Sequence, residues 1–231
     1  MTRELTFRVS ESAGEVSALL ERPHQARWLL VLAHGAGAGM RHAFMENLAS
    51  ELANAGIATL RYQFPYMQHR RGRPDPPAVL TATVRSAIGA AVETTPDLPL
   101  LAGGKSLGGR MTSHVFSELP RAGATDAVAR VIGLVFFGFP LHQPGRPDTK
   151  RADHLSRVTV PMLFLQGTRD ALADLSLVRP LCEGLAPRAT LHIVDDADHS
   201  FHVLKRSGTT DADVLRDLAR VTASWADSLR V

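Results

Sequence analysis

The segment GGKSLGG, residues 103–109, places one serine, Ser106, between glycines at positions 104 and 108. The pattern G-x-S-x-G is typical of a nucleophilic serine at a sharp turn from a strand into a helix. Side chains two residues before or after such a serine would collide with neighbouring backbone, and glycine avoids the collision. An apolar run precedes this segment and a stretch with helical spacing follows it. The context therefore predicts that Ser106 is a nucleophile.

A phosphate-binding loop is the alternative interpretation of the same glycines. The letters GGKS resemble the end of the motif G-x-x-x-x-G-K-[ST], in which a glycine-rich loop binds phosphates. The first glycine of that motif would fall at position 99, where the chain has Pro99. The spacing therefore disfavours a phosphate-binding loop.

A serine hydroxyl becomes a useful nucleophile only beside a base, which in turn needs a carboxylate to orient it. Two candidates follow predicted strands downstream: Asp170 after LFLQGTR, and His199 within DDADHSF. Because both follow strand ends, where sites in open α/β sheets assemble, we predict that His199 is the base and Asp170 the acid.

Each partner has a nearby rival. Asp174 lies four residues beyond Asp170, in a stretch that could begin a helix. His192 falls inside a predicted strand, and His202 lies three residues beyond His199. Their positions relative to the strand ends favour Asp170 and His199 over these rivals.

The elements that must position these residues follow a regular alternation. Short apolar runs alternate with segments of helical spacing, which predicts a mostly parallel sheet flanked by crossover helices. Eight strands are expected, the first two as an antiparallel pair, over residues 5–9, 16–21, 28–33, 57–62, 98–103, 131–137, 160–167 and 189–195. Five helices are expected over residues 44–56, 79–93, 107–119, 172–185 and 211–230.

Length and composition favour a single α/β domain over residues 1–231. With 231 residues, 45% of them hydrophobic, the chain can fill one sizeable core. The lone cysteine, Cys182, excludes an internal disulfide, which is consistent with a reducing, cytoplasmic location. The first residues lack the apolar segment of a secretory signal. The longest apolar stretch, residues 131–141, is about half of the roughly 20 residues that span a bilayer, so no membrane association is expected.

Charge argues against a nucleic-acid partner. The formal net charge is only +3, from 26 Lys and Arg against 23 Asp and Glu. The one basic cluster, residues 69–75, is followed by two prolines and lacks interleaved aromatic residues. We therefore expect a solvated loop there rather than a nucleic-acid site.

The order serine, aspartate, histidine on this strand pattern resembles the α/β-hydrolase superfamily over nearly the whole chain. Small size, no predicted cap domain, and the strings LAHGAGAG (32–39), RYQFPY (61–66) and GFPLHQPGRPD (138–148) are similar to the compact dienelactone-hydrolase-like branch. The resemblance implies an α/β-hydrolase fold. Dienelactone hydrolases use a cysteine nucleophile, whereas this chain has Ser106, so their substrate is not carried over.

An oxyanion hole is the second requirement for acyl transfer. One expected donor is the backbone N–H of Leu107, because it follows the nucleophile and begins a helix whose dipole favours negative charge. The resemblance to the family's H-G-x motif assigns the other donor to Ala36. His34 is expected to hold this loop in shape.

Together these residues predict a serine hydrolase, carboxylesterase-like or a thioesterase, that cleaves small acyl esters through an acyl-enzyme on Ser106. No metal or organic cofactor is expected, and the partner is a small-molecule ester. Phe64 and His142, in two Pro-rich connections over residues 63–78 and 138–153, are the candidate substrate contacts. The alternatives are a noncatalytic hydrolase-fold binding module, or a lactonase or peptidase with the same triad. The sequence leaves the oligomeric state open.

Overall fold

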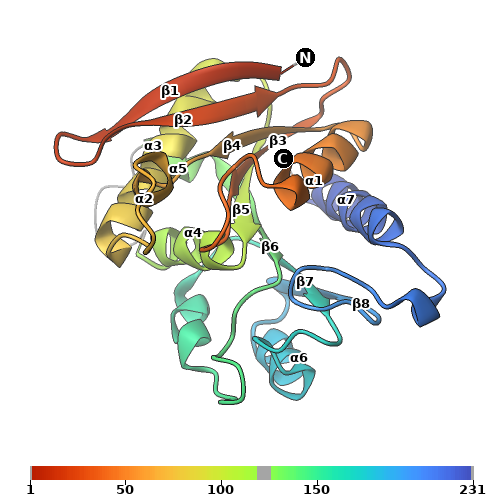
Figure 1. The fold of residues 1–231 in the computed structure, drawn as a ribbon. Coiled ribbons are helices and arrows are strands. Elements are labelled where there is room, and N and C mark those ends of the chain that lie inside the picture. Colours follow the sequence, from red (N-terminus) through yellow and green to blue (C-terminus); the bar gives the residue numbers. More distant parts are fainter. Residues whose placement is uncertain (1, 119–125, 230–231) are drawn as a thin grey trace.

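A single eight-stranded sheet organises the chain (Figure 1). The computed structural model describes residues 2–118 and 126–229. The strands are β1 (Thr2–Ser10), β2 (Gly14–Glu21), β3 (Trp28–Ala33), β4 (Ile57–Tyr62), β5 (Leu100–Lys105), β6 (Val131–Phe137), β7 (Met162–Gly167) and β8 (Ala189–Val194). They lie in the order β1-β2-β4-β3-β5-β6-β7-β8.

Only β2 runs against the rest of the sheet. β1 pairs with β2, and β2 with β4, in antiparallel fashion, and β4, β3, β5, β6, β7 and β8 are mutually parallel. The carboxyl ends of these six strands therefore lie along one edge, where sites of open α/β sheets form. This edge carries the elbow after β5 and the loops after β7 and β8.

Helices cover both faces of the sheet (Figure 1). On one face lie α1 (Ala43–Asn54) and α7 (Asp211–Ser228), and on the other lie α3 (Pro77–Thr94), α4 (Leu107–Ser117) and α6 (Leu175–Gly184). Shorter pieces are α2 (Pro65–Gln68), α5 (Asp126–Ala129) and the 3-10 turns η1 (Lys150–Arg157) and η2 (Lys205–Ser207). None of the helices in the described ranges is long and apolar enough to cross a membrane.

The period-two alternation of the strands builds two cores, one on each face. In β3, Leu29 and Val31 pack on the side of α3 and α4, while Leu30 and Leu32 pack on the side of α1 and α7. All six residues of β3 are buried, as expected for a strand with helices on both faces. The edge that carries the loops is thus supported by a sheet packed from both sides.

The predicted fold class is confirmed, with the expected antiparallel opening pair and without a large cap domain over the described residues. Strand ends differ from the expected ends by up to three residues. The pieces α2, α5 and η2 were not expected, because one turn of helix is too short to display a helical period. The eight-residue η1 was not expected either, because a 3-10 helix has three residues per turn and does not follow the 3.6-residue period. The expected ends of two helices, at residues 119 and 230, lie outside the described residues.

Candidate active site

Ser106 occupies the turn between β5 and α4 in a conformation that non-glycine residues rarely adopt, with φ 50° and ψ −115°. The flanking glycines are required by space. A Cβ on residue 104 would lie 2.4 Å from the carbonyl oxygen of Ala33, and one on residue 108 would lie 2.6 Å from the carbonyl oxygens of Ala33 and His34. The turn therefore packs directly on the end of β3, as the glycine spacing predicted.

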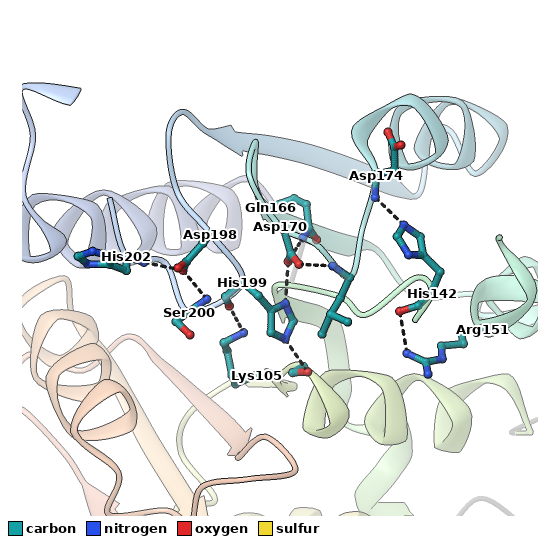
Figure 2. A network of polar contacts seen from close by, with 12 residues as sticks. Lys105, His142, Arg151, Gln166, Asp170, Asp174, Asp198, His199, Ser200 and His202 are labelled. Atoms are coloured by element: carbon teal, nitrogen blue, oxygen red, sulfur yellow. Dashed lines mark hydrogen bonds and ion pairs between the residues drawn. The ribbon is translucent and has the colours of Figure 1, made fainter. Parts of the chain in front are cut away.

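A chain of hydrogen bonds joins the three residues expected to act together (Figure 2). The hydroxyl Oγ of Ser106 lies 2.9 Å from Nε2 of His199, and Nδ1 of His199 lies 2.7 Å from Oδ2 of Asp170. The Asp170 side chain is 1% exposed and that of His199 is 25% exposed. The arrangement is that of a nucleophile, a base that solvent can reach, and a buried carboxylate.

The buried carboxylate is oriented from two sides. The amide of Leu172 donates to Oδ1 of Asp170 over 2.8 Å, and the side-chain Nε2 of Gln166, from β7, donates to Oδ2. Oδ2 is also the oxygen that accepts from His199. These bonds fix the carboxylate so that it faces the imidazole.

The loop that carries His199 is tied by its own aspartate. Oδ1 of Asp198 accepts from the amides of Ser200 and His202. Phe201 adopts a left-handed conformation with φ 62°, and its side chain is buried. The loop between β8 and α7 is therefore a compact turn that points the His199 imidazole toward the elbow.

The rival residues have other partners. Asp174 caps the N-terminus of α6, where Oδ1 accepts from the amide of Ser176 over 2.8 Å. His192 bonds to Asp217 over 2.7 Å, and His202 bonds to Asp211 over 2.8 Å. Neither of these histidines contacts a serine hydroxyl among the described residues.

The loop after β3 is shaped by two buried side chains. His34 contacts the carbonyl oxygen of Gly35 through Nδ1 over 2.7 Å and accepts from the amide of Phe64 at Nε2 over 3.1 Å. Burial lowers the pKa of His34 to about 4, so its imidazole is neutral near pH 7, with the proton on Nδ1. The hydroxyl of Tyr66 donates to the carbonyl oxygen of Ala36 over 2.8 Å. Both contacts hold carbonyl groups of this loop in place.

Two backbone amides remain available beside Ser106. Within residues 2–118 and 126–229, the N–H groups of Ala36 and Leu107 donate no hydrogen bond. Leu107 is the first residue of α4, where the helix dipole concentrates positive charge. Free amides at these two positions are what an oxyanion hole requires.

A pocket of about 370 Å³ opens in front of Ser106. Its walls are the loop 35–38, the start of α1 with Phe44 and Met45, and Leu172, His199 and Ser200 from the other side. The nucleophile thus faces a small cavity with largely apolar walls.

Among the described residues, no group of three or more His, Cys, Asp or Glu side chains is arranged to hold a metal ion.

The structure does not bring Phe64 or His142 to this pocket, which corrects the expected substrate contacts. Phe64 is completely buried and packs edge-on against His34 and Tyr62. His142 is also buried; Nδ1 contacts the carbonyl oxygen of Gln143, and Nε2 accepts from the amide of Asp174 (Figure 2). Both side chains support the loops instead. The expectation was wrong because a position in a Pro-rich connection does not specify which way a side chain points.

Three residues that the sequence did not place in the site also matter to its geometry: Tyr66, Gln166 and Lys105. Gln166 lies four residues before Asp170 within a strand whose other residues are apolar or glycine, and a polar residue in such a run is a signal for a buried partner. Tyr66 and Lys105 act through contacts distant in sequence, which no local pattern reveals.

Comparison with known proteins agrees with this fold. The family model described as the alpha/beta hydrolase domain matches residues 26–227. A dienelactone hydrolase from Anabaena variabilis is 23% identical with a TM-score of 0.73, and the match covers 99% of each chain. A serine hydrolase without lid from Xanthomonas campestris is 20% identical with a TM-score of 0.72, covering 100% of this chain and 96% of that one. An esterase domain from Rhodothermus marinus is 18% identical with a TM-score of 0.71, covering 99% of each.

The structural matches share the fold at low identity, and the family model spans most of the chain, from β3 to the end of α7. The expected likeness to the compact dienelactone-hydrolase-like branch is confirmed at the level of the fold. The chain belongs to the alpha/beta hydrolase family.

Proposed function

We infer that the protein is a serine hydrolase that cleaves small acyl esters through a covalent acyl-enzyme. Oγ of Ser106 attacks the ester carbonyl while Nε2 of His199 takes the hydroxyl proton, and the carbonyl oxygen becomes an oxyanion held by the amides of Ala36 and Leu107. The C–O bond to the leaving alcohol then breaks, and His199 returns the proton to that alcohol. Water, deprotonated by His199, attacks the acyl-enzyme and releases the carboxylic acid and free Ser106.

The observation that carries this proposal is the coincidence of three features at one point. The Ser106–His199–Asp170 chain of hydrogen bonds ends at the pocket, the backbone at Ser106 is strained, and two unpaired amides flank the hydroxyl. Strained backbone at such a position persists only where the surrounding structure enforces it, and it is commonly found at functional sites. A structural serine would need none of these features.

The size and lining of the pocket favour short acyl groups. A volume of about 370 Å³ lies at the low end for small-molecule sites, which span roughly 300–1,000 Å³. Two similar structures are described as esterases, one from Rhodothermus marinus and one cold-adapted from an Arctic metagenomic library, which supports ester bonds as the substrate class. Long-chain triglycerides fit this pocket poorly.

The test combines turnover with covalent capture. We expect hydrolysis of p-nitrophenyl acetate and butyrate at higher kcat/KM than of p-nitrophenyl decanoate, and labelling of Ser106 by a fluorophosphonate probe located by peptide mass spectrometry. Ser106→Ala should lose both. If folded protein takes up no probe and hydrolyses no ester in a panel of alkyl, thiol and cyclic esters, the enzymatic proposal is wrong and a binding role gains support.

The leaving group is settled by the same panel. A thioester differs from an ester in the atom that accepts the proton from His199, and a lactone differs in keeping acid and alcohol in one product. The site as described has the groups to process all three. The ratio of kcat/KM values for acyl-matched ester, thioester and lactone therefore defines the reaction.

A further inference from the structure

Lys105, the residue directly before Ser106, sends its side chain across the site rather than into solvent. Its amino group donates to the carbonyl oxygen of His199 over 2.5 Å, as Figure 2 shows. The same nitrogen lies 5.9 Å from the ring centroid of Phe44 and 5.4 Å from that of Phe201. Those two rings stack with centroids 5.9 Å apart, so one ammonium group joins β5, α1 and the loop that carries His199.

This contact is a second polar link between the elbow and the His199 loop, after the hydrogen bond from Ser106 to His199. The bonds made by Asp198 are internal to the loop. Other bonds join the loop to the segment after β7, through Thr168 and Arg169, and to α7, through Asp211. The Lys105 bond joins the loop to β5, because its donor is one residue from the nucleophile and its acceptor belongs to the base itself.

The amino group also lies close to the proton-transfer chain. A Cβ placed on Gly138 would be 3.0 Å from Nζ of Lys105, 3.5 Å from Oδ2 of Asp170 and 3.5 Å from Nδ1 of His199. All three atoms therefore lie within 3.5 Å of one point beside the backbone of Gly138. Within the described ranges, no carboxylate lies within 4.0 Å of Nζ, so the charge is not neutralised by a direct ion pair.

Charged side chains approach the His199 imidazole from more than one element. Asp170 faces it from the loop after β7, Asp198 lies beside it on its own loop, and Lys105 approaches from β5. His42, at the start of α1, lines the opposite wall of the pocket. Burial lowers the pKa of Lys105 to about 8, with Asp170 and Asp198 acting in the opposite direction, so the amino group is predominantly cationic near pH 7.

We propose that Lys105 positions His199. The bond from Lys105 to the carbonyl oxygen of His199 fixes the loop, and the positive charge of Lys105 favours the neutral, proton-accepting form of the imidazole. This proposal rests on the proposed hydrolase function. A like charge nearby disfavours the imidazolium form, whereas Asp170 favours it. Lys105 and Asp170 thus act on the imidazolium in opposite directions, and removal of the Lys105 charge leaves the effect of Asp170 unopposed.

The test uses Lys105→Met, which keeps the length and removes both the charge and the donor. We expect kcat on p-nitrophenyl acetate to fall roughly 10- to 100-fold with KM changed little, because small displacements of catalytic groups cost that much. The acidic limb of the kcat/KM profile should move to higher pH, an effect that a purely structural role would not produce. Lys105→Arg, which keeps charge and donors, should recover most of kcat and the original limb.

A matched control is Lys205→Met, the same change at an exposed lysine, which should leave kcat and the pH profile unaltered. If Lys105→Met does not fold, as judged by circular dichroism, Lys105→Gln removes the charge and keeps a polar end. A normal kcat with an unshifted acidic limb in the folded variant, while Ser106→Ala is inactive, would overturn the positioning role and leave the hydrolase proposal standing.

A second readout needs no turnover. Hydrogen–deuterium exchange of the peptide 195–203 should become faster in Lys105→Met and stay unchanged in Lys205→Met. Unchanged exchange in Lys105→Met would also refute the positioning role. If the parent protein hydrolyses no substrate and binds no fluorophosphonate, the hydrolase proposal fails instead, and the exchange result still decides whether Lys105 tethers the loop.

Discussion

A serine–histidine hydrogen bond occurs at two places along helix α4. At its start, Oγ of Ser106 lies 2.9 Å from Nε2 of His199, and two turns later Oγ of Ser113 lies 2.7 Å from Nε2 of His154. By distance alone the second pair is the closer one. The two pairs differ in three respects: which partner donates the hydrogen bond, which group contacts the other side of the imidazole, and whether the serine hydroxyl lines a pocket.

The hydroxyl hydrogen is committed in the second pair. Ser113 donates to the carbonyl oxygen of Arg110 over 2.8 Å, and a hydroxyl has only one hydrogen to give. The bond to His154 must then be donated by the imidazole, which is the reverse of what a general base does. Ser106, by contrast, sits outside the regular helix, and His199 is free to accept from it.

The group behind each imidazole also differs. His199 faces the carboxylate of Asp170, which stabilises a positive ring, whereas His154 stacks on His114 with ring centroids 3.7 Å apart. Burial, together with the charges of His114, Arg110 and Arg157, lowers the pKa of His154 to about 3. A serine–histidine contact therefore indicates catalysis only when a carboxylate supports the ring and the hydroxyl reaches a cavity.

Replacing each serine by alanine is the strongest way to break this comparison. Ser106→Ala should lower kcat/KM on p-nitrophenyl acetate by on the order of 10⁴-fold or more, because the nucleophile is gone. Ser113→Ala should keep kcat/KM within about twofold and lose about 1–3 kcal/mol of unfolding free energy in urea, because it leaves a buried N–H of His154 unpaired. Comparable activity losses in both variants would mean that the assignment of the nucleophile is wrong.

The acid can be separated from its neighbour in the same way. Asp170→Asn should reduce kcat by roughly 10³- to 10⁴-fold, since an amide cannot hold His199 in the accepting state. Asp174→Asn, four residues away at the start of α6, should leave kcat unchanged, because asparagine also caps helices well. Steady-state kinetics on the two purified variants provide the measurement, and equal activities would contradict the role of Asp170.

The two histidines should respond to pH in different properties. The pKa of His154, about 3, lies below the roughly 6.5 of an unfolded histidine. Between those values the unfolded chain binds more protons, so stability falls as the pH falls and is regained as it rises. His154→Gln should therefore weaken the slope of unfolding free energy between pH 6.5 and 4.5 by about 1.4 kcal/mol per pH unit.

Urea unfolding at several pH values measures this slope. His34, whose pKa is about 4, contributes in the same direction, so the slope is reduced but not abolished. His24→Gln, at an exposed histidine, controls for the change of side chain. Parallel curves for the parent and His154→Gln would show that His154 is not held neutral by the fold, and the contrast with His199 would lose its basis.

The features that could be predicted from sequence are those with a local physical cause. The glycines around Ser106 are required by the backbone of Ala33 and His34, and apolar alternation defines the strands whose ends carry Asp170 and His199. Because parallel strands end at one edge, strand order along the chain was enough to bring the three residues together. That inference did not depend on exact strand boundaries, which differed by up to three residues.

What could not be predicted depends on side-chain direction and on contacts distant in sequence. Phe64 and His142 lie in Pro-rich connections without a period, so nothing indicated that both point inward. The hydrogen bond of Gln166 to Asp170 and that of Lys105 to His199 require the folded arrangement of β5, β7 and the loops. The hydrogen bond between Ser113 and His154 could not be predicted either, because the two residues are far apart in the sequence.

The smallest expected effect concerns the loop that supplies the Ala36 amide. Tyr66→Phe removes the hydroxyl that donates to the carbonyl oxygen of Ala36, so the amide of the oxyanion loop is less firmly aimed. A loss of about 1 kcal/mol, roughly fivefold in kcat/KM, is expected, with kcat carrying most of the change because the oxyanion forms only in the transition state. Tyr62→Phe is the matched control, since Tyr62 is the only other tyrosine of the chain and its hydroxyl makes no hydrogen bond to the loop within the described residues. If both variants change kcat equally, Tyr66 acts through ring packing, and if only KM changes, the loop serves substrate binding rather than the oxyanion.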